Sequence, residues 1–189
     1  WPCMTVIVSG MIAGNPGQGG ASWAVLQYLL GLLQLGQDVY LIEPVTEDQL
    51  IPTCAPLECS ANAAYFRTVV REFGLERRCA LLLQGTSKTI GLPFSKLQTV
   101  TAEATVLFNI SGMLQDQDLI RNIPIRVFLD LDPAFNQLWH ATQGIDMRFS
   151  AHNCFVTVGK ALGESTCSIP TCNQSWITTF QPVVLDYWP

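Results

Sequence analysis

The sequence predicts an α/β protein in which residues 1–189 form one domain with a doubly wound, mostly parallel sheet of six or seven strands and helices on both faces. Three observations support this prediction. Short apolar runs alternate with segments of helical spacing, and the connections between them are short. The apolar runs are nearly unbroken, which is typical of strands covered on both faces. The length of 189 residues is sufficient for one continuous core.

The first half of the chain contains three predicted strands and two predicted helices. Strands are expected at 4–9 (MTVIVS), 38–42 (DVYLI) and 79–84 (CALLLQ), with helices over 21–35 and 62–73. Pro44 should end the second strand. Gly36 and Gly74 lie just beyond the two helices, where glycine commonly follows a helix C-terminus.

The second half continues the alternation. Strands are expected at 105–109, 125–131, 155–158 and 182–185, and helices over 94–100 and 133–142. Asp132 followed by Pro133 is a typical helix start, with Asp132 as N-cap.

The charge content excludes some classes of function and hints at a missing partner. Net charge is -5, and the ten Lys and Arg residues form no basic stripe, so nucleic-acid binding is not expected. Charged residues make up only 13%, against about a quarter in a typical soluble domain, which indicates either a surface that is largely neutral and polar or one that is partly covered by another domain. The most apolar segment, 24–35, is too short to span a membrane. Because a strand is expected from Met4, we expect no signal peptide and a cytoplasmic location.

Seven cysteines, an odd number, indicate reduced thiols in this compartment. Two pairs, Cys54 with Cys59 and Cys167 with Cys172, are each separated by four residues. Structural zinc pairs are usually closer together, so no metal site and no cofactor are expected.

The segment Gly10–Gly20 contains five glycines and follows the first predicted strand. A P-loop is excluded because no Gly-Lys-Ser/Thr ending is present. The dinucleotide fingerprint is nearly met: Ser22 stands where its third glycine or alanine belongs, and Glu43 ends the second strand where a ribose-binding acid would lie. A second interpretation is that the glycines serve only a sharp turn and close helix–sheet packing, and both alternatives stay open.

A third interpretation comes from a family resemblance over about 40 residues. Gly19-Gly20 opens a long apolar helix, and Leu32-Leu33-Gln34-Leu35-Gly36-Gln37-Asp38-Val39 leads into the second strand. This pattern resembles the N-terminal, Rossmann-like domain of GT-B glycosyltransferases, in which Leu-x-x-x-Gly-His-x-Val precedes that strand. Gln37 replaces the usual histidine.

Ten residues are candidates for the site, because the ends of parallel strands and the turn after the first strand face one crevice. The predicted substrate-binding residues are Gly14, Gly17, Gly19, Gly20, Ala21, Asn109, Ser111 and Asp132. The predicted catalytic residues are Asp130, a carboxylate at a strand end, and His152, in a loop before a strand; each is a potential general base.

The resemblance implies the N-terminal half of a two-domain enzyme that moves a sugar from a nucleotide-sugar donor to an acceptor hydroxyl without a bound metal. The missing C-terminal domain would hold most of the donor, so the chain alone is expected to be inactive. Two alternatives remain: a stand-alone nucleotide-binding domain of the NAD type, and a non-catalytic binding module.

Overall fold

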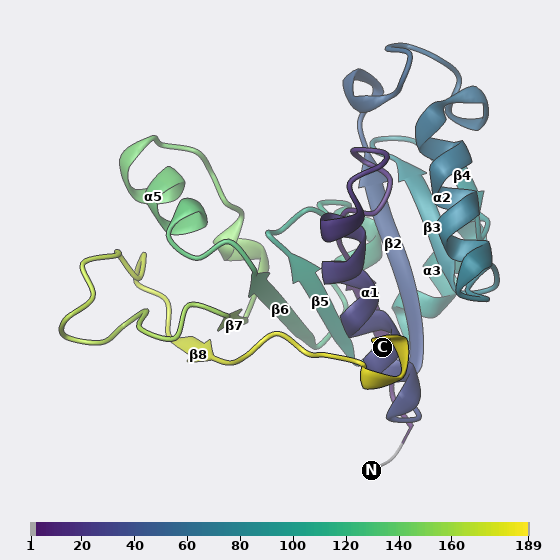
Figure 1. The fold of residues 1–189 in the computed structure, drawn as a ribbon. Coiled ribbons are helices and arrows are strands. Elements are labelled where there is room, and N and C mark those ends of the chain that lie inside the picture. The colour runs from purple at the N-terminus through teal and green to yellow at the C-terminus, as the bar shows by residue number, and fades with distance from the viewer. Residues whose placement is uncertain (1–2, 189) are drawn as a thin grey trace.

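The computed structural model describes residues 3–188, which form one eight-stranded sheet with the order β4-β3-β2-β1-β5-β6-β7-β8 (Figure 1). The strands are β1 (Thr5–Ser9), β2 (Asp38–Val45), β3 (Cys79–Leu83), β4 (Thr89–Gly91), β5 (Val106–Ile110), β6 (Ile125–Asp130), β7 (Cys154–Thr157) and β8 (Trp176–Thr178). The helices are α1 (Gly19–Gln34), α2 (Ala61–Glu72), α3 (Phe94–Glu103), α4 (Gln117–Ile120) and α5 (Phe135–Thr142). Four 3-10 turns are η1 (Glu47–Gln49), η2 (Leu57–Cys59), η3 (Phe149–Ala151) and η4 (Leu185–Tyr187).

The predicted fold class is confirmed. All neighbouring strands pair in parallel except β4, which is antiparallel to β3, and the central order β3-β2-β1-β5-β6-β7 is that of a doubly wound, Rossmann-like sheet. Six of the seven expected strands are present, and the two strands that were not expected are β4 and β8. Each has only three residues, too few for a pattern of apolar residues to appear in the sequence.

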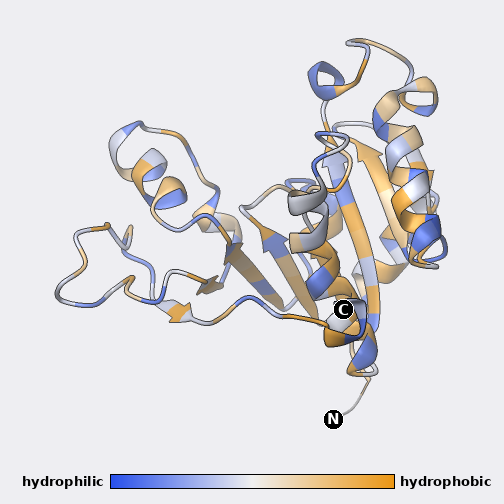
Figure 2. Ribbon diagram, in the orientation of Figure 1, coloured by the Kyte–Doolittle hydropathy of each residue, from blue (hydrophilic) through white to orange (hydrophobic). Residues whose placement is uncertain are grey.

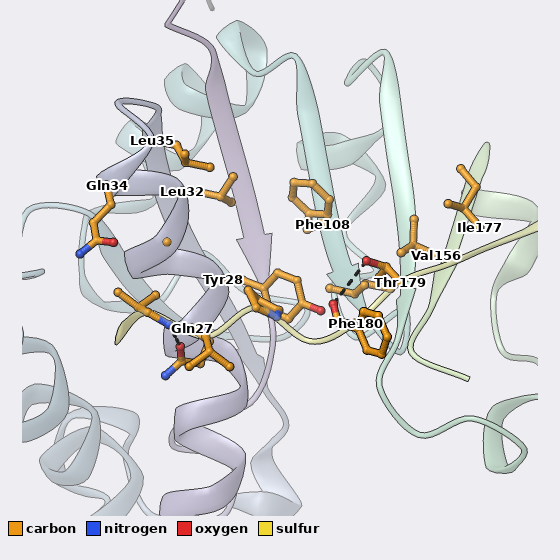
Figure 3. Close-up of a pocket in the computed structure, with 15 residues that line it drawn as sticks. Gln27, Tyr28, Leu32, Gln34, Leu35, Phe108, Val156, Ile177, Thr179 and Phe180 are labelled. Carbon is orange, nitrogen blue, oxygen red and sulfur yellow. Dashed lines mark hydrogen bonds between the residues drawn. The ribbon is translucent and has the colours of Figure 1, made fainter. Parts of the chain in front are cut away.

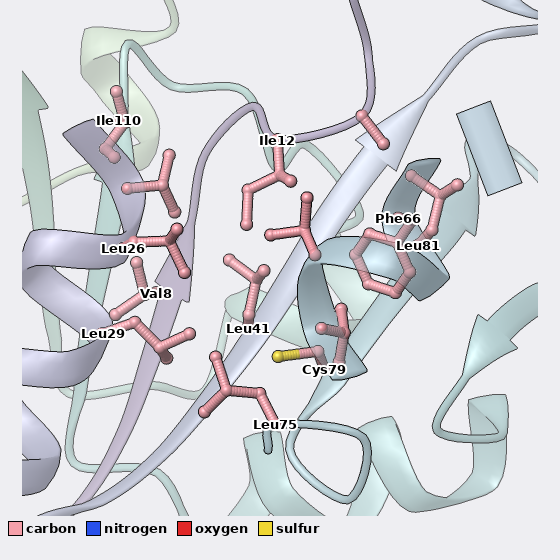
Figure 4. Close-up of a cluster of buried hydrophobic side chains, with 14 of the residues drawn as sticks. Val8, Ile12, Leu26, Leu29, Leu41, Phe66, Leu75, Cys79, Leu81 and Ile110 are labelled. Atoms are coloured by element: carbon pink, nitrogen blue, oxygen red, sulfur yellow. The ribbon is translucent and has the colours of Figure 1, made fainter. Parts of the chain in front are cut away.

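Both faces of the central strands are covered. Alternate residues of β1 point to opposite sides: Val6 and Val8 join the core beneath α1 and α2, whereas Ile7 joins the core beneath α3 and α4. Figure 4 shows the first core, where Leu26 and Leu29 of α1 face Leu41 of β2. The hydrophobic colour in Figure 2 accordingly concentrates in the strands of the sheet. Burial on both faces explains why these strands are unbroken apolar runs.

Two predicted boundaries were wrong for identifiable reasons. Strand β2 continues through Pro44 to Val45, because pairing with β1 ends at Leu41 and beyond that point β2 has only β3 beside it. A proline is tolerated where one side of a strand is free. Helix α5 begins at Phe135 and its N-cap is Ala134, with φ of 82°, and not Asp132.

The predicted strand at 182–185 is absent. This segment instead crosses α1, where the backbone N–H of Val184 donates a hydrogen bond to Oε1 of Gln27. The strand that joins the sheet edge is β8, and its Trp176 packs edge to face against Phe155, with ring centroids 5.5 Å apart and an angle of 70° between the ring planes. The ring centroid of Trp188 lies 5.6 Å from that of Trp23 on α1. Trp176 and Trp188 therefore both contact aromatic residues of this domain, and about half of Trp188 stays exposed.

Within residues 3–188, no helix combines the length and apolar character that crossing a membrane would require.

Candidate functional site

A cleft of about 320 Å³ opens at the carboxyl edge of the sheet, where β1 and β5 lie side by side and their connections leave in opposite directions. Its lining combines the start of α1 with the loops that follow β1, β5 and β6: Met11, Gly20, Ala21, Ala24, Val25, Ile110, Ser111, Met113, Leu131, Asp132 and Gln181. This is the topological switch point, where doubly wound sheets bind ligands. The volume falls at the lower end of the range for small-molecule sites.

Four of the predicted substrate-binding residues meet in this cleft: Gly20, Ala21, Ser111 and Asp132. Gly20 and Ala21 lie in the first turn of α1, where backbone N–H groups lack partners within the helix. The N-cap Gln18 makes no side-chain capping bond, and no acidic residue lies in that turn. The open N–H groups and the partial positive charge of the helix end therefore face a cleft that suits a phosphate or another oxyanion.

The loop between β1 and α1 is held by a carboxylate of the protein itself. Oε1 of Glu43 accepts hydrogen bonds from the backbone N–H groups of Ile12 at 2.9 Å, Ala13 at 2.7 Å and Gly14 at 2.7 Å. Asn62 Nδ2 donates to the carbonyl of Ala13 at 2.8 Å from the other side. The amide of Gly14 is thus already engaged, and only the part of the glycine-rich segment nearest the helix is open to a ligand.

Glu43 is fully buried, and this burial raises the pKa of its carboxyl from 4.5 to about 7, although the three backbone hydrogen bonds act in the opposite direction. Its second oxygen, Oε2, is buried without a hydrogen-bond partner among the described residues. A ribose-binding acid must offer its carboxylate to the ligand, and Glu43 offers it to the loop. This use of Glu43 argues against the dinucleotide interpretation.

The physical requirement for glycine differs among the glycines of Gly10–Gly20. A Cβ at Gly10 would lie 2.7 Å from both Ile110 Cδ1 and Val25 Cγ2, so glycine is required there for helix–sheet packing. Gly17 has φ of 86°, which disfavours other residues. Gly19 and Gly20 have neither reason, because a Cβ at either position would meet nothing within 4 Å. Nothing within the described fold requires glycine at these two helical positions.

Asp130 was predicted to face the cleft, but it is not among the residues that line it. It is fully buried, and four groups donate to its carboxylate: Asn136 Nδ2 at 2.6 Å, Gln137 Nε2 at 2.8 Å, Thr157 Oγ1 at 2.8 Å and the Asp132 backbone N–H at 3.1 Å. These bonds fix the loop after β6 and the start of α5 on the end of β7. Every donor belongs to the protein, so Asp130 has a structural role in this arrangement.

Asn109 and His152 lie next to each other, but on the side of the sheet away from α1. Asn109 Nδ2 and His152 Nε2 are 3.0 Å apart, and His152 Nδ1 lies 2.9 Å from the carbonyl oxygen of Arg148. Because that carbonyl can only accept, Nδ1 carries the proton and Nε2 accepts from the amide. Burial, which outweighs the bond to Arg148, lowers the pKa of His152 below its usual 6.5 and keeps the ring neutral. Neither residue reaches the cleft.

No group of three or more His, Cys, Asp or Glu side chains within residues 3–188 is arranged to hold a metal ion. All seven cysteines are free, and Cys54 and Cys59 are exposed.

A larger groove of about 550 Å³ lies between α1 and the β5–β8 half of the sheet. Figure 3 shows Tyr28 and Leu32 of α1 on one side, and Phe108 and Val156 of the sheet on the other. The chain segment that ends at Val184 crosses it. Its walls are mainly apolar, and sequence analysis did not anticipate it because the two sides are far apart in the chain.

In comparisons with known proteins, no protein-family model, no curated protein and no solved structure matches this chain. What the fold and the cleft define is a doubly wound α/β protein with a cleft at its switch point.

Proposed function

We propose that this chain is the acceptor-side half of a two-domain glycosyltransferase, and that the cleft between β1 and β5 forms one wall of the site for sugar transfer. The single observation that carries the proposal is the pair Gly19–Gly20. Glycine in the middle of a helix costs about 0.5–1 kcal/mol relative to alanine. Gly19 and Gly20 are the first two residues of α1, and neither backbone conformation nor internal packing calls for glycine there. A ligand that approaches the first turn of α1 closely would account for both glycines.

The lining supports a ligand that has both phosphate and hydroxyl groups. The N–H groups of the first α1 turn suit a phosphate oxygen, and the hydroxyl of Ser111 and the carboxylate of Asp132 suit sugar hydroxyls. A nucleotide of the NAD type is less well supported, because the acidic residue at the expected place, Glu43, is bonded to the loop.

In the proposed transfer, an acceptor hydroxyl attacks the anomeric carbon of the donor sugar. The bond from that carbon to the phosphate oxygen breaks, the nucleotide leaves with the electron pair, and the acceptor proton passes to a base. This chain orients the reacting groups in the cleft, which lowers the entropic part of the barrier. We assign the base to neither Asp130 nor His152, because the polar atoms of both are occupied by the protein.

The proposal is tested by titration calorimetry of the 189-residue chain with a panel of nucleotide sugars, sugar phosphates and NAD. We expect weak binding of the nucleotide sugars or sugar phosphates, no binding of NAD and no transfer by this chain alone. The double variant Gly19→Ala/Gly20→Ala should keep or raise the unfolding midpoint and weaken binding at least about tenfold, because the methyl groups obstruct the approach.

Gly31→Ala is the matched control. Gly31 lies in the same helix but away from the cleft, and its added Cβ would meet only Val184 Cγ2 at 3.4 Å. This variant should bind as the wild type does. Tight binding of NAD, or unchanged affinity in the double alanine variant, would contradict the proposal.

A further inference from the structure

A second hollow at the carboxyl edge of the sheet borders the α3 core, whereas the cleft described above borders the α1 core. It consists of two cavities of about 260 and about 250 Å³ that share Leu114, Gln115 and Arg148 in their linings. The first cavity extends to Gln84, which follows β3, and the second to Gln117 and Ser150. We call the two together the Arg148 groove.

Both walls of the Arg148 groove are attached to one buried pair, Asn109 and His152. Asn109 Oδ1 accepts from the backbone N–H of Leu114 at 3.0 Å, and its Nδ2 donates to the carbonyl of Leu114 at 2.9 Å. The same Nδ2 donates to His152, whose Nδ1–H donates to the carbonyl of Arg148. Because Asn109 is fully buried, this link fixes the spacing between the two walls before any ligand arrives.

The groove contains a cation with unused donors. Among the described residues, the only ion pair of Arg148 is with Asp146, from Nε to Oδ2 at 3.5 Å, and Oδ1 of Asp146 accepts from the Arg148 backbone N–H at 2.8 Å. The other acid in the lining, Asp116, is occupied as the N-cap of α4. The two terminal nitrogens of the guanidinium therefore remain available as a planar fork, which matches the two oxygens of a carboxylate or phosphate.

The remaining polar groups are neutral and suit hydroxyls. Gln84 Nε2 donates to Gln115 Oε1 at 3.4 Å, a long bond that leaves further amide donors and acceptors free at the surface of the groove. The side chains of Leu82 and Leu114 supply an apolar floor.

We propose that the Arg148 groove is a second binding site, which takes a small polyhydroxylated molecule with a carboxylate or phosphate group. Arg148 binds the oxyanion and the amides of Gln84 and Gln115 bind the hydroxyls. This site does not rest on the proposed glycosyltransferase function, because it shares no lining residue with the cleft between β1 and β5.

The test is an NMR titration of the chain with glucose 6-phosphate, glucuronate and glucose, in which backbone amide shifts locate the binding. We expect millimolar or tighter binding of at least one of the two anions, weaker binding of glucose, and shifts at Gln84, Gln115 and Arg148. If glucose 6-phosphate binds more tightly than glucuronate, the preferred oxyanion is a phosphate. If glucuronate binds more tightly, it is a carboxylate. Shifts confined to Gly20 and Ser111, or no binding of either anion, would overturn the proposal.

Arg148→Met should weaken binding about tenfold or more, because a charge-assisted, two-point contact is lost. Arg121→Met is the matched control: Arg121 is an exposed arginine of similar setting, 3.6 Å from Asp118, outside the groove. It should bind as the wild type does. If both variants lost the same affinity, the loss would come only from the change in net charge, and the proposed site would be refuted. Gly19→Ala/Gly20→Ala should leave this affinity unchanged, which separates failure here from failure of the proposed function.

Discussion

Replacing Glu43 with glutamine should change how the stability of the protein depends on pH. Glu43 is fully buried, its Oε1 holds three backbone amides of the glycine-rich loop, and its Oε2 has no partner among the described residues. Glutamine has nearly the same shape, and its Oε1 can accept the same three bonds. The variant therefore removes the ionisation and leaves the loop in place.

The magnitude follows from the two pKa values of the carboxyl, about 7 in the folded protein and 4.5 as the reference for the unfolded chain. The folded state binds the proton more tightly, so Glu43 contributes stability below pH 4.5 that is lost as pH rises through about 7. At about 1.4 kcal/mol per pH unit, the loss amounts to about 3 kcal/mol. Most of it should fall between about pH 5 and pH 8.

Urea unfolding at a series of pH values measures this effect as the difference in unfolding free energy between wild type and Glu43→Gln. The difference should shift by about 3 kcal/mol in favour of the variant as pH rises. Glu47→Gln, at an exposed carboxyl in η1, controls for the loss of one negative charge. Parallel stability curves for wild type and Glu43→Gln would refute the assignment of a buried, titrating carboxyl beneath the loop.

Three further substitutions test the remaining structural assignments. Asp130→Asn should lower the unfolding free energy by about 2–4 kcal/mol in urea denaturation, because an amide cannot accept from all four donors; an unchanged midpoint would contradict this role. Gly10→Ala should destabilise by about 1–3 kcal/mol, since its Cβ would lie 2.7 Å from Ile110 and Val25, whereas Gly20→Ala should not; thermal unfolding that ranks them in the other order would be inconsistent with the packing. As pH falls below 6.5, the wild type should lose stability, because the depressed pKa of His152 means that the unfolded chain takes up this proton before the folded protein does. His152→Gln should abolish this loss. If the unfolding free energy of both proteins fell equally towards acid pH, a buried neutral ring would be excluded.

The fold class could be predicted because its main signal is local. Buried parallel strands such as β3 are continuous apolar runs, and α1 is an apolar helix that ends at Gln34, with the positive-φ Gly36 just beyond it. Strands β4 and β8 could not be predicted, since three residues at a sheet edge carry no periodicity. The extension of β2 through Pro44 depends on where the neighbouring β1 ends, which is a property of the register and not of the strand itself.

The site could be predicted only in part, for a related physical reason. Gly20, Ala21, Ser111 and Asp132 meet in the cleft because strand ends in a parallel sheet converge at one edge. The roles of Glu43 and Asn109 depend on partners far along the chain: Glu43 reaches amides about 30 residues earlier, and Asn109 reaches His152, which is 43 residues later. Such pairings leave no local pattern. Arg148 was missed because nothing in its neighbours along the chain indicates that it lies between two cavities.

The proposed function requires that a ligand lies against the first turn of α1. The measurement that tests it is the change in backbone amide shifts of Gly19, Gly20 and Ser111 when the tightest-binding nucleotide sugar or sugar phosphate is titrated into the chain. We predict that these amides shift with a single binding curve, while Gly31, in the same helix, does not. Saturable binding with the largest shifts elsewhere, and none at Gly19 and Gly20, would contradict the claim.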